Sequence, residues 1–117
     1  MRPGDVLAGD PVAMATYERV RLELEALGPV VIRTTKSQIA FRRRRAFAWL
    51  WRPGQYLRGP AAPIVLTIAL GRHDPSPRFK EVVHPTPRHW MHHLEVFDPA
   101  SIDDEVIRWL REAADRA

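Results

Sequence analysis

The residues with the strongest chemical character are four consecutive arginines: Arg42, Arg43, Arg44 and Arg45. A guanidinium group stays protonated in proteins, and its planar fork of N–H donors fits phosphate and carboxylate oxygens. Aromatic side chains follow directly at Phe47, Trp49 and Trp51, and arginines beside aromatic rings are typical of nucleic-acid contacts. The block therefore predicts an anionic partner, either nucleic acid or a small phosphate or carboxylate ligand. The alternative is a solvated tip between two strands, where repelling charges deter edge-to-edge aggregation.

The histidines and carboxylates give weaker signs of chemistry. His92 and His93 are neighbours in a predicted strand and face opposite sides, while His89 lies about 13 Å along that strand from His93. Because metal-binding histidines must converge on one point, we expect no metal site. His93 and Glu95 share a face and are a candidate acid–base pair. No nucleophile motif, phosphate loop or nucleic-acid-binding signature occurs, so we expect no cofactor and no catalytic residue, and the sequence favours a protein that is not an enzyme.

Length and composition predict one small soluble domain over residues 1–117, with its core over about residues 12–115. No apolar run approaches the roughly 18 residues of a membrane helix, and the first residues lack the apolar region of a signal peptide. There is no cysteine, so disulfides and thiolate chemistry are excluded. We expect a cytoplasmic protein with no membrane contact.

The positive charge is concentrated in the first half of the chain. The formal net charge is +4, with 11 basic against 5 acidic residues over 1–58 and 7 against 9 over 59–117. A nucleic-acid footprint would therefore be limited to the region around the arginine block.

The pattern of apolar residues predicts a helix, several strands and a second helix. The first helix begins at Asp10-Pro11 and ends at Gly28-Pro29, and the second begins after a cap at Ser101 or Asp103. Extended segments are expected at residues 30–33, 38–42, 45–52, 64–70 and 90–96. Residues 71–88, with four prolines, are expected to be mostly irregular. This order predicts an α+β fold: an antiparallel sheet of three to five strands, with an N-terminal and a C-terminal helix packed on one face.

Alternation along the strands sorts the side chains into two faces. Bulky side chains, among them Phe47, Trp49 and Trp51, are expected under the helices. The other face then carries smaller or more polar residues: Ala46, Ala48, Val65, Thr67, Ala69, Met91, His93 and Glu95. It is predicted to be a ligand cradle or, alternatively, a partly solvated surface or a homodimer interface that includes Ala48 and Thr67. The number of residues in the arginine turn decides which arginines point towards this face.

Two short segments have a recognisable pattern: residues 88–96, RHWMHHLEV, and residues 102–113, IDDEVIRWLREA. With the hairpin over residues 39–48, they resemble a small bacterial family catalogued as domain of unknown function 5655, over roughly residues 12–115. The resemblance implies an N-terminal helix, a hairpin, a central apolar strand, a strand with two histidines and a final helix. Such domains occur alone or attached to others, including nuclease-like ones, and some are labelled predicted transport proteins. The resemblance implies no catalytic or cofactor residues, and it favours Arg88 and His93 as polar positions.

Three functional hypotheses follow. The first is a binding module that holds nucleic acid or a small anionic ligand through the arginine block, with Arg88, Thr67, His93 and Glu95 as further ligand-binding residues. The second is a homo-oligomerising interaction domain without a ligand, in which the arginines only keep the protein soluble. The third is an enzyme that uses His93 and Glu95.

Overall fold

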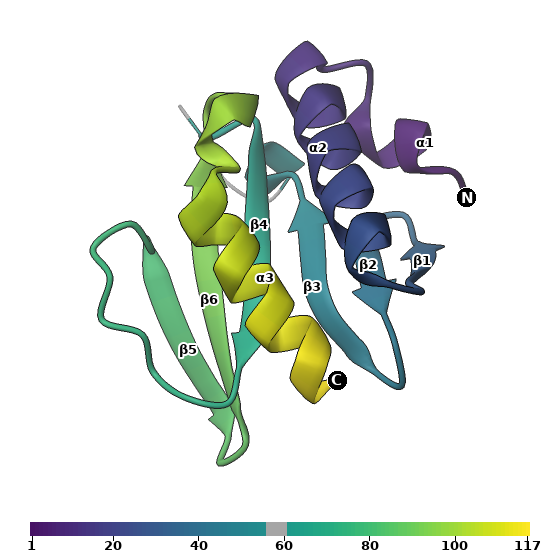
Figure 1. Ribbon diagram of the computed structural model, residues 1–117. Coiled ribbons are helices and arrows are strands. Elements are labelled where there is room, and N and C mark those ends of the chain that lie inside the picture. Colours follow the sequence, from purple (N-terminus) through teal and green to yellow (C-terminus); the bar gives the residue numbers. More distant parts are fainter. Residues whose placement is uncertain (56–60) are drawn as a thin grey trace.

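A computed structural model describes residues 1–55 and 61–117 of the chain. In this part of the chain six antiparallel strands form one sheet in the order β1-β2-β3-β4-β6-β5, and the helices α2 and α3 lie across one of its faces (Figure 1). The elements are α1 Pro3–Leu7, α2 Pro11–Leu27, β1 Val31–Thr34, β2 Gln38–Arg42, β3 Ala46–Trp51, β4 Ile64–Leu70, β5 Glu81–Thr86, β6 His89–Val96 and α3 Asp104–Arg116, with short 3-10 turns at Pro53–Gln55 and Pro99–Ser101. The predicted α+β class and the two helices on one face are confirmed.

Both long helices begin at the residues that the sequence indicates. The Asp10 carboxylate accepts a hydrogen bond from the backbone N–H of Ala13 at 3.0 Å, ahead of Pro11. Asp103, rather than Ser101, caps α3 by accepting from the backbone N–H of Val106 at 3.1 Å. Each side chain satisfies an N–H group that has no partner within its own helix.

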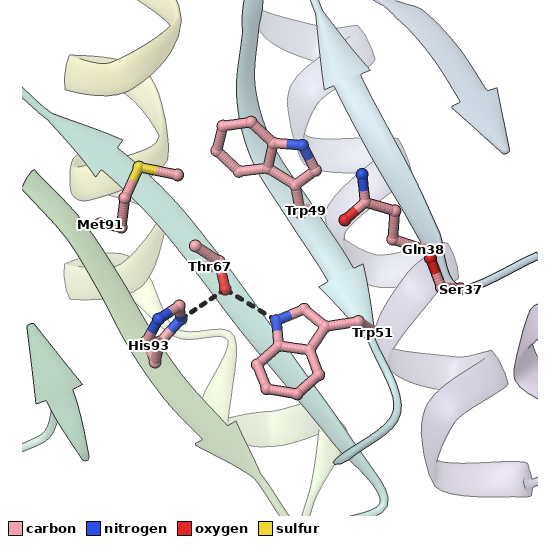
Figure 2. Close-up of a pocket in the computed structure, with 7 residues that line it drawn as sticks. All are labelled: Ser37, Gln38, Trp49, Trp51, Thr67, Met91 and His93. Carbon is pink, nitrogen blue, oxygen red and sulfur yellow. Dashed lines mark hydrogen bonds between the residues drawn. The ribbon is translucent and has the colours of Figure 1, made fainter. Parts of the chain in front are cut away.

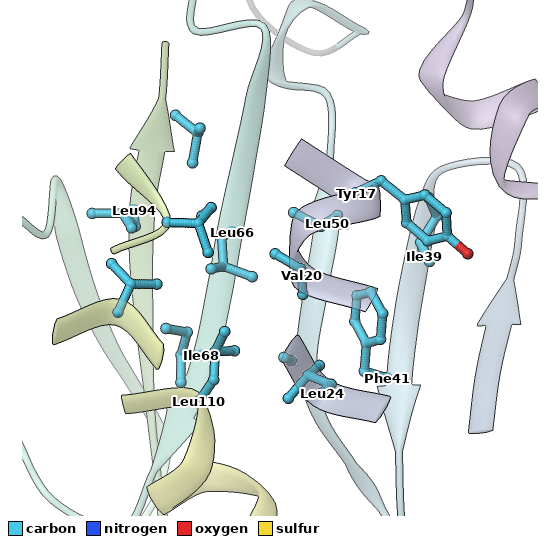
Figure 3. Packing of buried hydrophobic residues seen from close by; sticks show 14 of the residues in the cluster. Tyr17, Val20, Leu24, Ile39, Phe41, Leu50, Leu66, Ile68, Leu94 and Leu110 are labelled. Carbon is cyan, nitrogen blue, oxygen red and sulfur yellow. The ribbon is translucent and has the colours of Figure 1, made fainter. Parts of the chain in front are cut away.

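The core lies between the sheet and the two helices. Every residue of β4 is buried, which confirms its prediction as the central strand. Figure 3 shows apolar side chains of α2 and α3 meeting those of the sheet: Val20, Leu24, Leu110, Ile39, Phe41, Leu50, Leu66, Ile68 and Leu94. Full burial of one such side chain contributes about 1.5–3 kcal/mol, so this layer fixes the sheet beneath the helices.

Two elements were not predicted from the sequence, the short helix α1 and the strand β5. The prediction that residues 71–88 are mostly irregular was wrong for residues 81–86, which form β5. This strand tolerates Pro85 because it lies at the edge of the sheet, where a missing N–H need not break the ladder. Within residues 1–55 and 61–117 the sheet therefore has six strands instead of three to five.

A β-bulge at Phe47 reverses the predicted facing of the β3 residues that follow it, whereas Ala46 and Phe47 lie on their predicted faces. Phe41 pairs with Ala48 and Arg42 pairs with Ala46, so Phe47 is an extra residue in β3. Phe47 and Ala48 both belong to the core beneath the helices. The expectations that Trp49 and Trp51 lie in that core, and that Ala48 lies on the opposite face, were wrong, because strict alternation does not allow for the extra residue.

Candidate functional site

The face of the sheet opposite α2 and α3, called here the open face, carries the candidate site. Trp49 pairs with Thr67, and Thr67 pairs with His93, so these three side chains lie in one row across β3, β4 and β6. Directly opposite residues of antiparallel strands share a face. None of the described helices lies over this row (Figure 1). The predicted placement of Thr67 and His93 on the open face is therefore confirmed.

A first pocket of about 290 Å³ lies over this row. Its lining consists of Ser37, Gln38, Trp49, Trp51, Thr67, Met91 and His93. Figure 2 shows both indole rings lying nearly flat against the sheet, with their faces turned outward. The His93 ring stands on edge beside Trp51, at 85° and 5.9 Å between ring centroids. The pocket thus has an aromatic floor with polar groups at its sides.

A chain of hydrogen bonds links Trp51, Thr67 and His93. The indole Nε1–H of Trp51 donates to the Thr67 hydroxyl at 2.8 Å, and that hydroxyl lies 2.7 Å from Nδ1 of His93 (Figure 2). Because an indole N–H can only donate, the Thr67 hydroxyl accepts from Trp51, and the same hydroxyl either donates to Nδ1 of His93 or accepts from it, according to the tautomer of the ring. Burial lowers the pKa of His93, while Glu81 acts in the opposite direction to a smaller extent. Burial thus favours the neutral form of the His93 imidazole.

A second pocket of about 300 Å³ adjoins the first and shares two of its side chains, Trp49 and Met91. The rest of its lining consists of Arg45, Ala46, Ala69, Pro85 and His89. Most of these side chains are apolar, and the cation of Arg45 lies at the border. Burial, followed by the neighbouring arginines, lowers the pKa of His89, which marks this end of the open face as a region of positive potential.

The structure divides the predicted arginine site. Arg43 donates to the carbonyl of Ala114 at 3.2 Å, and Arg45 donates to the carbonyl of Arg116 at 2.9 Å. These carbonyls form the negative end of the α3 dipole, so both arginines cap that helix. Arg42 pairs with Ala46, which lines the second pocket, and therefore lies on the open face. Arg44 is exposed at the tip of the turn.

The remaining candidate residues lie at opposite ends of the open face. Arg88 is exposed in the β5–β6 turn, and its carbonyl accepts from the Arg116 guanidinium at 2.7 Å. The β5–β6 turn that carries Arg88 therefore lies at the same end of the strands as the β2–β3 turn and the C-terminal end of α3 (Figure 1). Glu95 lies at the other end, beside Lys80 at 3.4 Å. The structure thus brings Arg88 towards the arginine block and places Glu95 away from it.

His93 and Glu95 line one further pocket of about 310 Å³ but do not bond to each other in the described residues. His92, on the helix side, is fully buried and has both ring nitrogens engaged. Its Nδ1–H donates to the Trp90 carbonyl at 2.9 Å, and its Nε2 accepts from the N–H of Asp74 at 3.0 Å. The described residues contain no group of three or more metal-ligand side chains. None of the described helices has the length and apolarity to cross a membrane.

Sequence reasoning missed the aromatic floor and its amide neighbour, Gln38. The available signal was in β2, where Ile39 and Phe41 alternate with Gln38 and Ala40. If the apolar pair faces the helices, Ala40 faces outward, and so does its cross-strand partner Trp49. That inference needs the pairing register, which the bulge at Phe47 sets.

Comparison with models of protein families matches residues 4–116 to the family described as Domain of unknown function (DUF5655). This agrees with the resemblance in the β6 and α3 segments and covers nearly the whole chain. Neither the curated proteins nor the solved structures contain a match.

Proposed function

The chain belongs to the DUF5655 family of domains of unknown function, and from its own geometry we propose that it is a binding module for an anionic ligand. The ligand binds at the end of the open face where the second pocket, the β2–β3 turn and the β5–β6 turn meet. This region is called here the basic end, and its arginines are Arg42, Arg44, Arg45, Arg88 and Arg116.

The observation that carries the proposal is that five arginines without an ion pair to the described residues gather at one end of the sheet. Several arginines elsewhere form ion pairs with carboxylates: Arg72 contacts Asp74 and Glu112, and Arg78 contacts Asp103 and Glu105. By contrast, the five arginines of the basic end form no ion pair with a carboxylate in the described part of the chain. A single carboxylate side chain, Asp115, lies with Arg44, Arg45 and Arg116 in a surface hollow. Uncompensated guanidinium groups around one pocket favour the arrival of a phosphate or carboxylate.

A variant that removes two exposed charges tests the proposal. Arg44→Ala/Arg88→Ala removes guanidinium groups without hydrogen bonds to the described residues, so we expect the fold to be retained. Binding of a labelled polyanion, such as heparin or a dT12 oligonucleotide, is measured by fluorescence anisotropy over a salt series. We expect the wild type to bind at low salt and the variant to bind at least about tenfold more weakly. If both arginines contact phosphates of dT12, the magnitude of the slope of log K against log salt falls by about 1.4.

The matched control is Arg108→Ala/Arg111→Ala, which removes the same charge from exposed positions of α3. We expect its affinity to stay within about twofold of the wild type. If the control weakens binding as much as the test variant, net charge alone governs binding and the site is wrong. Absence of any polyanion binding by the wild type at low salt contradicts the proposal altogether.

A second candidate function, homodimerisation through the open face, is supported by the half-buried Trp49 and Met91. The predicted interface residue Ala48 lies in the core beneath the helices and is unavailable for it. Sedimentation equilibrium of the wild type and of Trp49→Gln tests this function, which requires a dimer that the substitution dissociates. The third hypothesis, an enzyme using His93 and Glu95, stays a prediction.

A further inference from the structure

We infer that the anionic ligand is single-stranded nucleic acid, with unpaired bases in the two pockets on either side of Trp49 and phosphates at the basic end. This inference rests on the proposed function and names its ligand class. The argument begins with Trp49, which lines both pockets together with Met91. Its ring lies nearly flat over the sheet, with one face turned outward (Figure 2). An aromatic face in this orientation is a platform on which a nucleobase can stack, whatever its sequence.

The two pockets differ in a way that suits the parts of a nucleotide. The first has hydrogen-bonding groups beside the aromatic floor, namely the hydroxyl of Ser37 and the amide of Gln38. The Gln38 amide lies next to the Trp49 ring (Figure 2), and it has no hydrogen-bond partner among the described side chains. An amide both donates and accepts hydrogen bonds, so it can form hydrogen bonds with the edge of an unpaired base.

The second pocket combines an apolar lining with positive charge at its border. Ala46, Ala69 and Met91 provide surface for the flat face of a ring. Arg45 borders the same pocket, and the exposed Arg88 lies in the turn beside it. A base in this pocket would place its phosphate near these guanidinium groups, which suit phosphate oxygens geometrically.

The arrangement favours a single strand over the other anions considered. A polyphosphate or a sulfated sugar has no flat ring and would leave the Trp49 platform unused. A duplex keeps its base faces stacked and would meet only the arginines. A mononucleotide would fill one pocket, whereas two adjoining pockets with a shared tryptophan suit successive bases of one strand.

Trp49→Leu separates ring stacking from charge attraction. Binding of dT12, of polyphosphate, of a dT12·dA12 duplex and of thymidine monophosphate is measured for the wild type and variant at one low salt concentration. We expect wild-type dT12 to bind more tightly than the other three and to quench tryptophan fluorescence. Trp49→Leu should weaken dT12 binding by about tenfold or more, within the range known for base–aromatic stacking, and leave polyphosphate binding unchanged. Trp49→Phe keeps a ring and should recover part of the loss.

Circular dichroism and thermal unfolding confirm that both variants fold. Loss of polyphosphate binding in folded Trp49→Leu would contradict the separate roles of the ring and the arginines. If the wild type binds polyphosphate or duplex as tightly as dT12, or if Trp49→Leu binds dT12 normally, this inference is overturned while the anion-binding proposal stands. Equal affinity for thymidine monophosphate and dT12 overturns the single-strand assignment in favour of one nucleotide. If the wild type binds none of the four, both proposals fail.

Discussion

The two faces of the sheet are built from the same strands but use side chains for different purposes. On the helix side, apolar residues are fully buried. In the loop after β4, Arg72 forms an ion pair with Glu112 of α3. On the open face, Trp49 is half-buried, and the arginines at the basic end form no ion pair with a carboxylate in the described residues. Arginines such as Arg72 are neutralised by carboxylates, whereas those at the basic end, including Arg45 with its bond to a carbonyl of α3, keep a charge that is unpaired among the described residues. Substitutions on the two faces should therefore separate stability from binding.

The largest expected effect is on stability from the helix side. Leu66 is fully buried beneath the helices, and Leu66→Ala should lower the free energy of unfolding by about 2–5 kcal/mol through lost burial and a residual cavity. Urea denaturation with an unchanged m-value measures this loss. Trp49→Leu, on the open face, is the comparison variant, and it should lower the free energy of unfolding by less than Leu66→Ala does. A larger loss for Trp49→Leu than for Leu66→Ala would contradict the division of roles between the faces.

A second effect concerns neighbouring histidines on opposite faces. Burial lowers the pKa of both His92 and His93 below the ordinary value of about 6.5. Below that pH the unfolded chain binds protons that the folded chain does not. The contribution of both residues to stability is therefore fully present above about pH 6.5 and is lost as pH falls through their folded pKa values, at about 1.4 kcal/mol for each unit of pKa difference.

Urea denaturation between pH 7.5 and 5 measures this dependence, and His93→Asn assigns it. The variant lacks the titrating ring on the open face, so its stability should fall less steeply over this range than that of the wild type. The buried His92, held between Asp74 and Trp90, should account for the remainder. A wild-type stability that rises as pH falls from 7.5 to 5 would contradict the sign of both shifts.

The third effect is smaller and comes from the paired arginines. Arg78 contacts Asp103 and Glu105, donates to the Ser101 carbonyl at 3.1 Å, and lies over the Trp109 ring at 5.8 Å. Arg78→Ala should lower the free energy of unfolding by about 1–2 kcal/mol in total, because each of these partly exposed contacts contributes only a little to stability. The loss should shrink at high salt, where ion pairs are screened. Unchanged polyanion binding is expected, since this arginine lies away from the basic end; a tenfold loss of binding would contradict that expectation.

Much of the helix side could be predicted from local sequence. Asp10-Pro11 and Gly28-Pro29 mark the ends of α2 because capping and the loss of helix continuation act over a few residues. The apolar run of β4 indicated its burial without knowledge of its neighbours.

The open face could be predicted only in part, because its composition depends on register. Thr67 and His93 were placed correctly, since alternation holds within β4 and β6. The outward facing of Trp49 depends on one extra residue at Phe47, and a single such residue reverses every side chain beyond it. The capping of α3 by Arg43 depends on a contact between residues 71 positions apart, which no local pattern reveals.

The smallest stability effect gives the sharpest comparison, because it uses adjacent arginines. Arg43 donates to the Ala114 carbonyl and lies 3.6 Å from Asp115, so Arg43→Ala should lower the free energy of unfolding by about 0.5–1 kcal/mol, as for a charge at a helix C-terminus. Arg44 is exposed and forms no hydrogen bond with the described residues, so Arg44→Ala should leave stability within about 0.5 kcal/mol of the wild type. Urea denaturation compares the two variants.

Polyanion binding should show the opposite order. Both variants lose one positive charge, so net charge affects them equally, and any difference in affinity reports position. Arg44→Ala should weaken dT12 binding more than Arg43→Ala, because the Arg43 guanidinium is engaged by α3 and turned towards the helix side. Equal losses of affinity would mean that the arginine block acts as a diffuse charge. A larger loss for Arg43→Ala would mean that the end of α3, and not the open face, is the binding surface.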